Sequence, residues 1–237
     1  MTESDKKRTP FVVLFQGRCG STYLVEALAK HSRIRCWKEY FSTLKDRKYS
    51  AAEQLDWLDS FYNNPPAECT AVGFKTKLDD VLDLQGFAEA LGRYRARVIH
   101  LQRRNTIKLT VSFFNAMRLN ELTGDWNLYE PGDRPERLNI DLERFDTWLQ
   151  AAERRSEAET AFVTQLGLPT LNVSYEDLLA DETRTLHRIM DFLDVDHEDV
   201  RGDALKVTSN DMRDAIENFD ELWGRYKGTS YEAMFVE

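Results

Sequence analysis

Cysteine is scarce in this chain, and its spacing excludes the sites that cysteines commonly build. Cys19, Cys36 and Cys69 are the three that the 237 residues contain. No two of them have the short separation, about two to four residues, of the cysteine pairs in zinc sites, and they do not resemble the paired framework of a small secreted domain. The sequence therefore predicts neither a disulfide scaffold nor a bound metal.

Long apolar runs and an excess of positive charge are also missing. No stretch reaches the roughly 18 apolar residues that cross a bilayer, and the first residues, MTESDKKRTP, lack the apolar segment of a secretion signal. The net charge is −9, which argues against nonspecific binding to nucleic acids or anionic membranes. We therefore expect a cytoplasmic protein with no transmembrane segment. If its ligand is a polyanion, the cations must be concentrated in a cleft.

A short apolar run begins the part of the chain that is richest in chemistry. Residues 11–15, FVVLF, show no polar alternation, which is typical of a strand buried on both faces of a parallel sheet. Residues 16–20, QGRCG, then form a tight turn, and Ser21 and Thr22 begin a helix. The free amides of a first helical turn, two hydroxyls and Arg18 together predict an anion site, most naturally for a phosphate.

The same turn differs from the loop that binds ATP or GTP. That loop, G-x-x-x-x-G-K-S/T, has a lysine that spans the outer phosphates and a hydroxyl that holds magnesium. Here Gly20 is followed directly by Ser21, and the cation comes earlier, at Arg18. The turn is therefore better suited to one terminal phosphate than to a magnesium-bridged pair. The alternative interpretation is an ordinary turn between a strand and a helix.

Strand-like and helix-like segments alternate along the rest of the chain. Further strands are predicted over residues 34–36, 70–74, 97–101 and 170–173. Helices are predicted over residues 51–62, 78–91 (closed by Gly92), 106–122, 141–166 and 177–193, followed by a polar tail. The alternation predicts an α/β fold, a single domain over residues 1–237 with a central parallel sheet of about five strands and helices on both faces. Residues 1–9 are expected to be flexible, and residues 123–140 to form a surface loop near the acceptor.

Charged residues recur where the predicted strands end. Parallel strands present their carboxyl ends at one edge of a sheet, where ligands bind in open α/β folds. Five cations and one carboxylate share this placement: Arg18, Lys75, Lys77, Arg103, Arg104 and Glu39. Solvated surface charge is the ordinary explanation for any one of them. Because the placement recurs at four strand ends, we expect these side chains to face one cleft.

These segments resemble sulfotransferases that use 3′-phosphoadenosine 5′-phosphosulfate (PAPS). Residues 18–22, RCGST, are similar to that family's loop for the 5′-phosphosulfate, K-S-G-T-T, with arginine in place of lysine. Arg104 follows a strand and Ser112 comes eight residues later, as in the family's 3′-phosphate segment. An arginine fork and a hydroxyl can share a dianionic phosphate through charge-assisted hydrogen bonds. The resemblance implies a P-loop NTPase-like fold that takes PAPS as co-substrate and needs no metal.

Two less specific matches extend the resemblance toward the C-terminus. Tyr175 occupies the place of a tyrosine that contacts adenine, and Lys227 with Gly228 resembles an element that closes over the 3′-phosphate. Tyr23 is a further candidate for stacking on adenine, with a buried helix aromatic as its alternative. The predicted donor-binding residues are therefore Arg18, Cys19, Gly20, Ser21, Thr22, Tyr23, Arg104, Ser112, Tyr175, Lys227 and Gly228, all but Tyr23 on the strength of the resemblance.

One departure from the family pattern concerns the base. In the cytosolic phenol branch a histidine two residues after a strand-end lysine is the base, but Lys77 stands there in this chain. In the carbohydrate-modifying branches the base is a glutamate after the second strand, and residues 37–41, WKEYF, resemble that setting. The resemblance therefore assigns Glu39 as base, with Lys75 and Arg18 as catalytic cations. The alternative for Glu39 is a surface carboxylate paired with a neighbouring cation.

The predicted function is sulfuryl transfer from PAPS to a hydroxyl of a small-molecule, carbohydrate or lipid acceptor. The Glu39 pattern places the chain closer to the carbohydrate-type and bacterial branches than to the phenol branch. Two other classes are kept open, a P-loop-like kinase that uses ATP and a catalytically silent nucleotide-binding scaffold. The missing lysine before Ser21 counts against the kinase.

Overall fold

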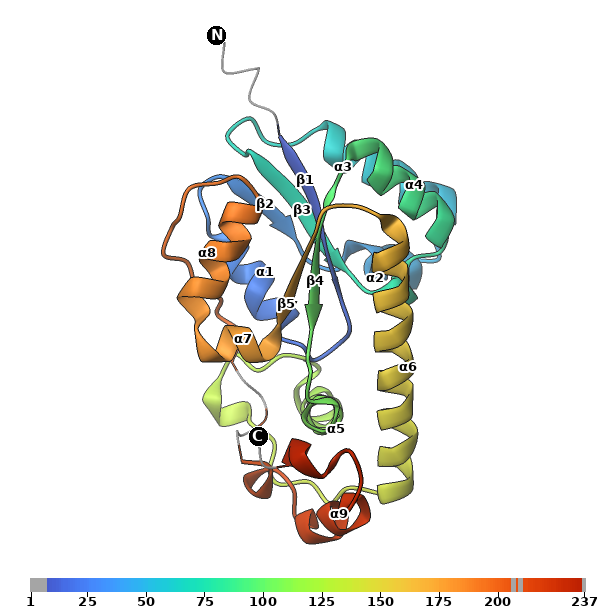
Figure 1. Ribbon diagram of the computed structural model, residues 1–237, viewed down its shortest axis with the longest axis vertical. Coiled ribbons are helices and arrows are strands. Elements are labelled where there is room, and N and C mark those ends of the chain that lie inside the picture. The colour runs from blue at the N-terminus through green and yellow to red at the C-terminus, as the bar shows by residue number, and fades with distance from the viewer. Residues whose placement is uncertain (1–7, 206–207, 209–210, 236–237) are drawn as a thin grey trace. The chain divides into compact units, whose positions relative to one another are not determined.

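The computed structural model describes residues 8–205, 208 and 211–235, and within them one sheet has five parallel strands (Figure 1). The strands are β1 (Thr9–Phe15), β2 (Ile34–Trp37), β3 (Ala71–Thr76), β4 (Arg97–Gln102) and β5 (Thr170–Ser174). Their order across the sheet is β2-β3-β1-β4-β5. Each pair of neighbours is parallel, so the predicted α/β class and the number of strands are confirmed.

Helices follow the strands along the chain. They are α1 (Ser21–Ala29), α2 (Tyr40–Asp46), α3 (Ala51–Asn63), α4 (Leu84–Tyr94), α5 (Thr106–Thr123), α6 (Leu142–Leu166), α7 (Tyr175–Ala180), α8 (Glu182–Phe192) and α9 (Phe219–Tyr226). The chain packs as two compact units. The first is formed by the described residues of 1–102 and 158–202, and the second by those of 103–157 and 203–237. The predicted extent of a single domain stays a prediction.

In the first unit, helices cover both faces of the sheet (Figure 1). Phe11, Val13 and Phe15 of β1 point to one face, in a cluster with apolar residues of α1, α7 and α8. Val12 and Leu14 point to the other face, in a cluster with residues of α2, α3, α4 and the C-terminal part of α6. Since both faces of β1 are buried, both sets of side chains must be apolar, which explains the unbroken run FVVLF.

The second unit has its own apolar cluster, and it corrects the prediction of a polar tail. Buried residues of α5 and α6, among them Ile107 and Phe145, pack with residues from the C-terminal segment. Phe219, Leu222 and Tyr226 lie on one side of α9 at helical spacing and are all buried. The segment looked polar because α9 is short and amphipathic, and its average composition hides its apolar face.

Two predicted helices have different boundaries in the structure. Gly92 does not close a helix, because α4 continues to Tyr94. The helix begins at Leu84 rather than at residue 78, and the carboxylate of its N-cap residue, Asp83, accepts the Gly86 N–H at 3.0 Å. The region 177–193 is two helices rather than one, because Asp181 leaves the helical conformation. The Asp181 carboxylate then caps α8 by accepting the Arg184 N–H at 3.0 Å.

The predicted flexible N-terminus is only partly within the described residues. Residues 1–7 lie outside them, whereas Thr9 begins β1 and is buried, so it is not part of a flexible end. The predicted surface loop over 123–140 is irregular and mostly exposed. Leu128 and Ile140 are its buried anchors. Its nearness to an acceptor stays a prediction.

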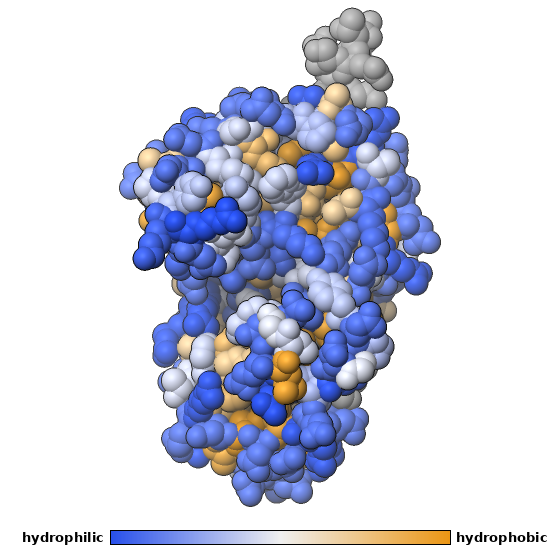
Figure 2. All heavy atoms as spheres, turned by 180° about the vertical axis from the view of Figure 1, so that it is seen from behind, coloured by the Kyte–Doolittle hydropathy of each residue, from blue (hydrophilic) through white to orange (hydrophobic). Residues whose placement is uncertain are grey.

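The surface is largely polar, as the high content of charged residues leads one to expect. Figure 2 shows hydrophilic side chains over most of one face of the molecule, with small apolar areas between them. Among the described residues, no helix has the length and apolar character that crossing a membrane requires.

Two glycines provide a matched test of the packing in the first unit. A Cβ on Gly73, in the middle of the sheet, would lie 2.4 Å from the Phe11 carbonyl oxygen, whereas a Cβ on Gly92, on α4, would meet nothing within 4 Å. Gly73→Ala should therefore lower the free energy of unfolding by about 1–3 kcal/mol. Gly92→Ala should raise it by about 0.5–1 kcal/mol, because alanine is the better helix former. Urea denaturation measures both, and equal effects of the two variants would contradict the described packing.

Candidate active site

The turn after β1 requires two left-handed residues. Arg18 has φ 71° and Gly20 has φ 82°, a region that favours glycine. Gly20 is also crowded, because a Cβ there would lie 2.8 Å from Cδ2 of Tyr175. Gly20 occupies the N-cap position of α1, and no side chain of the N-cap residue bonds the first amides of that helix. The turn therefore has the local geometry of an anion site, with the Tyr175 ring against it.

Lys75 is the buried cation of this region. The strand β3 runs two residues past the predicted end at Phe74. Lys75 therefore lies within the strand rather than after it, and its side chain is buried on a face of the sheet. Only 2% of its side chain is exposed. The Nζ atom donates to Thr22 Oγ1 at 2.9 Å and to Ser21 Oγ at 3.3 Å. It lies 3.1 Å from Glu39 Oε1.

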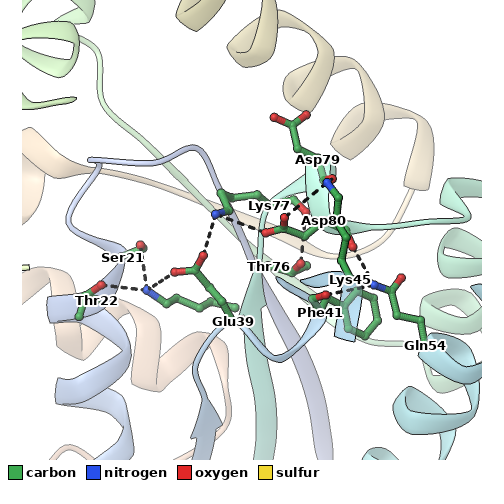
Figure 3. Close-up of polar contacts among 11 residues, drawn as sticks. Ser21, Thr22, Glu39, Phe41, Lys45, Gln54, Thr76, Lys77, Asp79 and Asp80 are labelled. Atoms are coloured by element: carbon green, nitrogen blue, oxygen red, sulfur yellow. Dashed lines mark hydrogen bonds and ion pairs between the residues drawn. The ribbon is translucent and has the colours of Figure 1, made fainter. Parts of the chain in front are cut away.

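Glu39 joins two lysines at the start of α2. Its second oxygen, Oε2, lies 2.9 Å from Nζ of Lys77, and Lys77 lies 3.3 Å from Asp80 Oδ2 (Figure 3). The Glu39 side chain is 29% exposed, so solvent or a substrate can reach it. The structure thus brings together five of the residues predicted for the strand ends and the turn: Ser21, Thr22, Glu39, Lys75 and Lys77.

The charges of this cluster set its protonation. Burial raises the pKa of the Glu39 carboxyl, but the positive charges of Lys75 and Lys77 outweigh burial and hold the pKa below its usual value. Burial lowers the pKa of Lys75 by more than Glu39 raises it. For Lys77, burial also lowers the pKa, but Glu39 and Asp80 outweigh it and the net pKa is raised. Glu39 is therefore ionised and able to accept a proton near neutral pH, whereas Lys77 stays protonated and cannot replace the histidine base.

Cys19 serves packing rather than chemistry. Its side chain is fully buried in the apolar cluster that also contains Phe15 and Leu24. Burial raises the pKa of its thiol to about 12, so the thiolate is not available near neutral pH. Any part of Cys19 in binding a donor would have to come from its backbone.

Tyr23, the second adenine candidate, is engaged elsewhere in the first unit. Its hydroxyl donates to the Glu182 carboxylate, and its ring packs against Gly202, where a Cβ would lie 2.7 Å from Tyr23 Cδ2. Burial, followed by the hydrogen bond to Glu182, raises the pKa of Tyr23 to about 12. Of the two tyrosines, Tyr175 is the one beside the turn.

The residues predicted for the 3′-phosphate belong to the second unit. Arg104 is exposed and precedes Asn105, which caps α5 by accepting the Lys108 N–H at 2.8 Å. Ser112 lies two turns into α5 and is buried. Near the C-terminus, Lys227 Nζ lies 4.8 Å from the centroid of the Trp223 ring, and the Gly228 N–H donates to Glu232 at 2.8 Å. The common role of these four predicted residues stays a prediction.

Two polar residues beside Glu39 were not predicted. Asp80 is a buried carboxylate in the short 3₁₀ segment η2 (Leu78–Asp80), and Gln54 of α3 is 1% exposed. The spacing of Lys77 and Asp80, three residues apart, is a signal that could have suggested their ion pair. Nothing in the sequence near Gln54 marks it.

The fold is α/β and P-loop-like, because a glycine turn joins the central strand of a parallel sheet to a helix, although the turn lacks the G-x-x-x-x-G-K-S/T pattern. A family model described as Stf0 sulphotransferase matches residues 68–228, more than half of the chain. The chain therefore belongs to the Stf0 sulphotransferase family, which confirms the resemblance and supports a transferase enzyme. The matched segment includes Lys75, Arg104, Ser112 and Tyr175, and it begins after the turn and Glu39.

Individual proteins are also similar to this chain. The chain is 25% identical over 239 aligned positions to Nodulation protein H of Rhizobium tropici, covering 95% of this chain and 92% of that protein. Its fold is similar to that of a crystal structure of a sulfotransferase from Alicyclobacillus acidocaldarius, with a TM-score of 0.52 and 18% identity. That similarity covers 97% of this chain and 96% of the other, and it supports the fold.

Proposed function

We propose that the protein transfers a sulfuryl group from PAPS to a hydroxyl of a small-molecule, carbohydrate or lipid acceptor, with Glu39 as the base. The observation that carries this proposal is the position of Lys75. Its buried ammonium contacts the hydroxyls of Ser21 and Thr22 on one side and the Glu39 carboxylate on the other. One cation thus joins the anion site at the helix start to an ionised base.

The 5′ end of the donor would lie over the start of α1. The amides of the first helical turn and the two hydroxyls suit a phosphate, and Arg18 adds charge from the turn. Lys75 already donates to the same hydroxyls, so it is placed to contact the oxygens of the sulfuryl group or of the departing phosphate. Cations at these oxygens stabilise the charge that accumulates during transfer.

The reaction step is a single displacement at sulfur. The acceptor oxygen attacks sulfur in line, and the bond between sulfur and the bridging phosphate oxygen breaks. The proton of the acceptor hydroxyl moves to the Glu39 carboxylate, and adenosine 3′,5′-bisphosphate leaves with the electron pair of the broken bond. Glu39 suits this role because its carboxylate is ionised and partly exposed. The chain's own cations supply the charge stabilisation, so the proposal includes no metal.

For the 3′ end of the donor we propose the residues that the family resemblance implies. Arg104 is exposed and has five donors in a planar fork, which suits a phosphate dianion. Ser112, Lys227 and Gly228 are proposed as its partners. Tyr175 is the favoured contact for adenine because its ring lies against Gly20 in the turn.

Which nucleotide the protein binds tests directly whether it is a sulfotransferase or a kinase. Adenosine 3′,5′-bisphosphate at about 100 times its dissociation constant should raise the melting temperature by about 5–10 °C. ATP with magnesium at the same concentration should have a smaller effect. A thermal-shift assay measures both. Stabilisation by ATP with magnesium alone would favour a kinase, and stabilisation by the bisphosphate with no turnover on any acceptor would favour a silent scaffold.

Replacing the base should separate chemistry from donor binding. Glu39→Gln removes the proton acceptor and keeps the size of the side chain, so kcat should fall by about 10²-fold or more. The dissociation constant of adenosine 3′,5′-bisphosphate, measured by calorimetry, should change little. Glu89→Gln, on the exposed side of α4, is the matched control and should keep full activity. Normal turnover in Glu39→Gln would remove the assignment of the base.

Removing the Arg104 guanidinium should weaken binding of the donor nucleotide through its 3′-phosphate. Arg104→Ala takes away charge-assisted hydrogen bonds worth about 1.5–3 kcal/mol, so the dissociation constant of adenosine 3′,5′-bisphosphate should rise by about 10- to 100-fold. Affinity for adenosine 5′-phosphate, which lacks the 3′ group, should not change. Arg118→Ala, which removes another exposed arginine of the second unit, is the control. An unchanged affinity for the bisphosphate in Arg104→Ala would rule out this contact.

A further inference from the structure

Asp80 is a buried carboxylate that the proposed reaction does not use. It is 7% exposed and lies at the end of η2, just after β3. Its Oδ2 lies 3.3 Å from Nζ of Lys77, and its Oδ1 lies 3.9 Å from Nζ of Lys45 on α2. Burying a carboxylate is costly unless it has partners of opposite charge, so these two lysines account for its presence there.

Gln54 fixes the two segments that carry Asp80 and Glu39. Its amide nitrogen donates to the carbonyl oxygen of Asp80 at 2.7 Å and to that of Phe41 at 3.3 Å, and its amide oxygen accepts the N–H of Leu82 at 3.0 Å. Phe41 comes two residues after Glu39 in the chain. Figure 3 shows Gln54 reaching from α3 toward Phe41. One buried amide therefore ties the start of α2 to η2.

The five charged groups alternate in sign along a line of contacts. Lys75 contacts Glu39, Glu39 contacts Lys77, Lys77 contacts Asp80, and Asp80 faces Lys45. In this series the ammonium of Lys77 is shared between two carboxylates. The hydroxyls of Ser21 and Thr22 complete the surroundings at the Lys75 end.

Both oxygens of Glu39 are occupied by lysines in this arrangement. To take a proton from an acceptor hydroxyl, Glu39 must free one oxygen. Lys75 is almost wholly buried, at 2% exposure, whereas the Lys77 side chain is 33% exposed, so Lys77 is the partner that can move. Asp80 offers the displaced ammonium a second carboxylate at a distance it already spans.

We propose that Asp80 is a positioning residue for the base, acting through Lys77, whose ammonium it shares with Glu39 and draws away when the acceptor binds. This inference rests on the proposed function, which names Glu39 as the base and an acceptor hydroxyl as the source of its proton. Two consequences follow for Glu39. Its carboxylate is stabilised by less than the full charge of Lys77, so Glu39 is a stronger base than it would be if Lys77 contacted Glu39 alone. Its Oε2 is also easier to free.

The sign of the electrostatic effect follows from the groups that face each other. Lys75, Lys77 and Asp80 act on Glu39, and Lys77, Lys45 and Glu39 act on Asp80. Burial raises the pKa of Asp80, with Lys77 opposing it, and Glu39 raises it further. The repulsion between the two carboxylates is mutual. Neutralising Asp80 therefore removes a repulsion from Glu39 and leaves it the whole ammonium of Lys77, and both changes lower the pKa of Glu39.

The central variant is Asp80→Asn, which removes the charge and keeps the shape. The pKa of Glu39 is measured in the unliganded protein by the carboxyl ¹³C shift, assigned with Glu39→Gln, and the acid limb of kcat/KM is followed against pH. Both should move to lower pH, and the plateau of kcat/KM should fall by about 3- to 10-fold because the base is weaker and less easily freed. Asp79→Asn, its exposed neighbour, is the matched charge control and should leave both unchanged.

A double-variant cycle tests whether Asp80 acts through Lys77. Lys77→Met removes one cation from Glu39, so it should move the pKa of Glu39 upward. In the Lys77→Met background, Asp80→Asn should move that pKa by much less than in the wild type. Asp80→Ser is measured in the same way, so that the pKa of Glu39 can still be compared if the asparagine variant does not fold.

The outcomes separate this inference from the proposed function. An upward shift or no shift of the Glu39 pKa in Asp80→Asn, or an equal shift with and without Lys77, would overturn the role of Asp80. The ¹³C titration needs no turnover, so it decides the role even if no sulfated product is found. Conversely, a downward shift that depends on Lys77, together with full activity in Glu39→Gln, would support the coupling of the charges and reject the base.

Discussion

The contact between the buried ammonium of Lys75 and the Glu39 carboxylate is the interaction on which the site depends. A lysine with 2% of its side chain exposed loses its hydration, and an unpaired charge in such a place costs several kcal/mol, to an order of magnitude. The Glu39 carboxylate and the hydroxyls of Ser21 and Thr22 are the partners that offset this cost. The three segments that provide these groups must therefore meet, and the adjacency of β2, β3 and β1 in the sheet brings them together.

The same interaction explains why the base and the anion site form one unit. Lys75 faces the side of the sheet that α1 covers, since it pairs in register with Val13, which belongs to the cluster on that side. The helix start with its hydroxyls is thus within reach of a side chain from the neighbouring strand. In P-loop nucleoside triphosphatases the lysine belongs to the loop itself. Here a lysine of β3 contacts the hydroxyls that follow the turn.

Much of the fold could be predicted from local patterns. The run FVVLF and the turn with Gly20 are local signals, and the structure confirms both of them. The errors arose where local signals mislead. Gly92 resembles a helix end because glycine often ends helices, but α4 runs past it and ends against Arg95, a non-glycine residue in the left-handed conformation. The apolar face of α9 is hidden in the average composition, because three of the helix's eight residues are charged.

The site residues that could be predicted are those at or near the ends of strands. Glu39, Lys75 and Lys77 follow or end strands that are neighbours in the sheet, so topology alone brings them close. Asp80 and Gln54 could not be found in this way. Asp80 lies in a 3₁₀ turn that looked like the first turn of a longer helix, and Gln54 acts only on backbone groups, which leave no trace in the sequence.

The role of Lys75 between the anion site and the base can be tested by a crystal structure of the complex with adenosine 3′,5′-bisphosphate. We expect the 5′-phosphate within hydrogen-bond distance of the Ser21 and Thr22 hydroxyls, with Nζ of Lys75 in contact with it and Glu39 open to the acceptor side. A nucleotide bound elsewhere, with residues 18–22 empty and Lys75 unmoved, would contradict it.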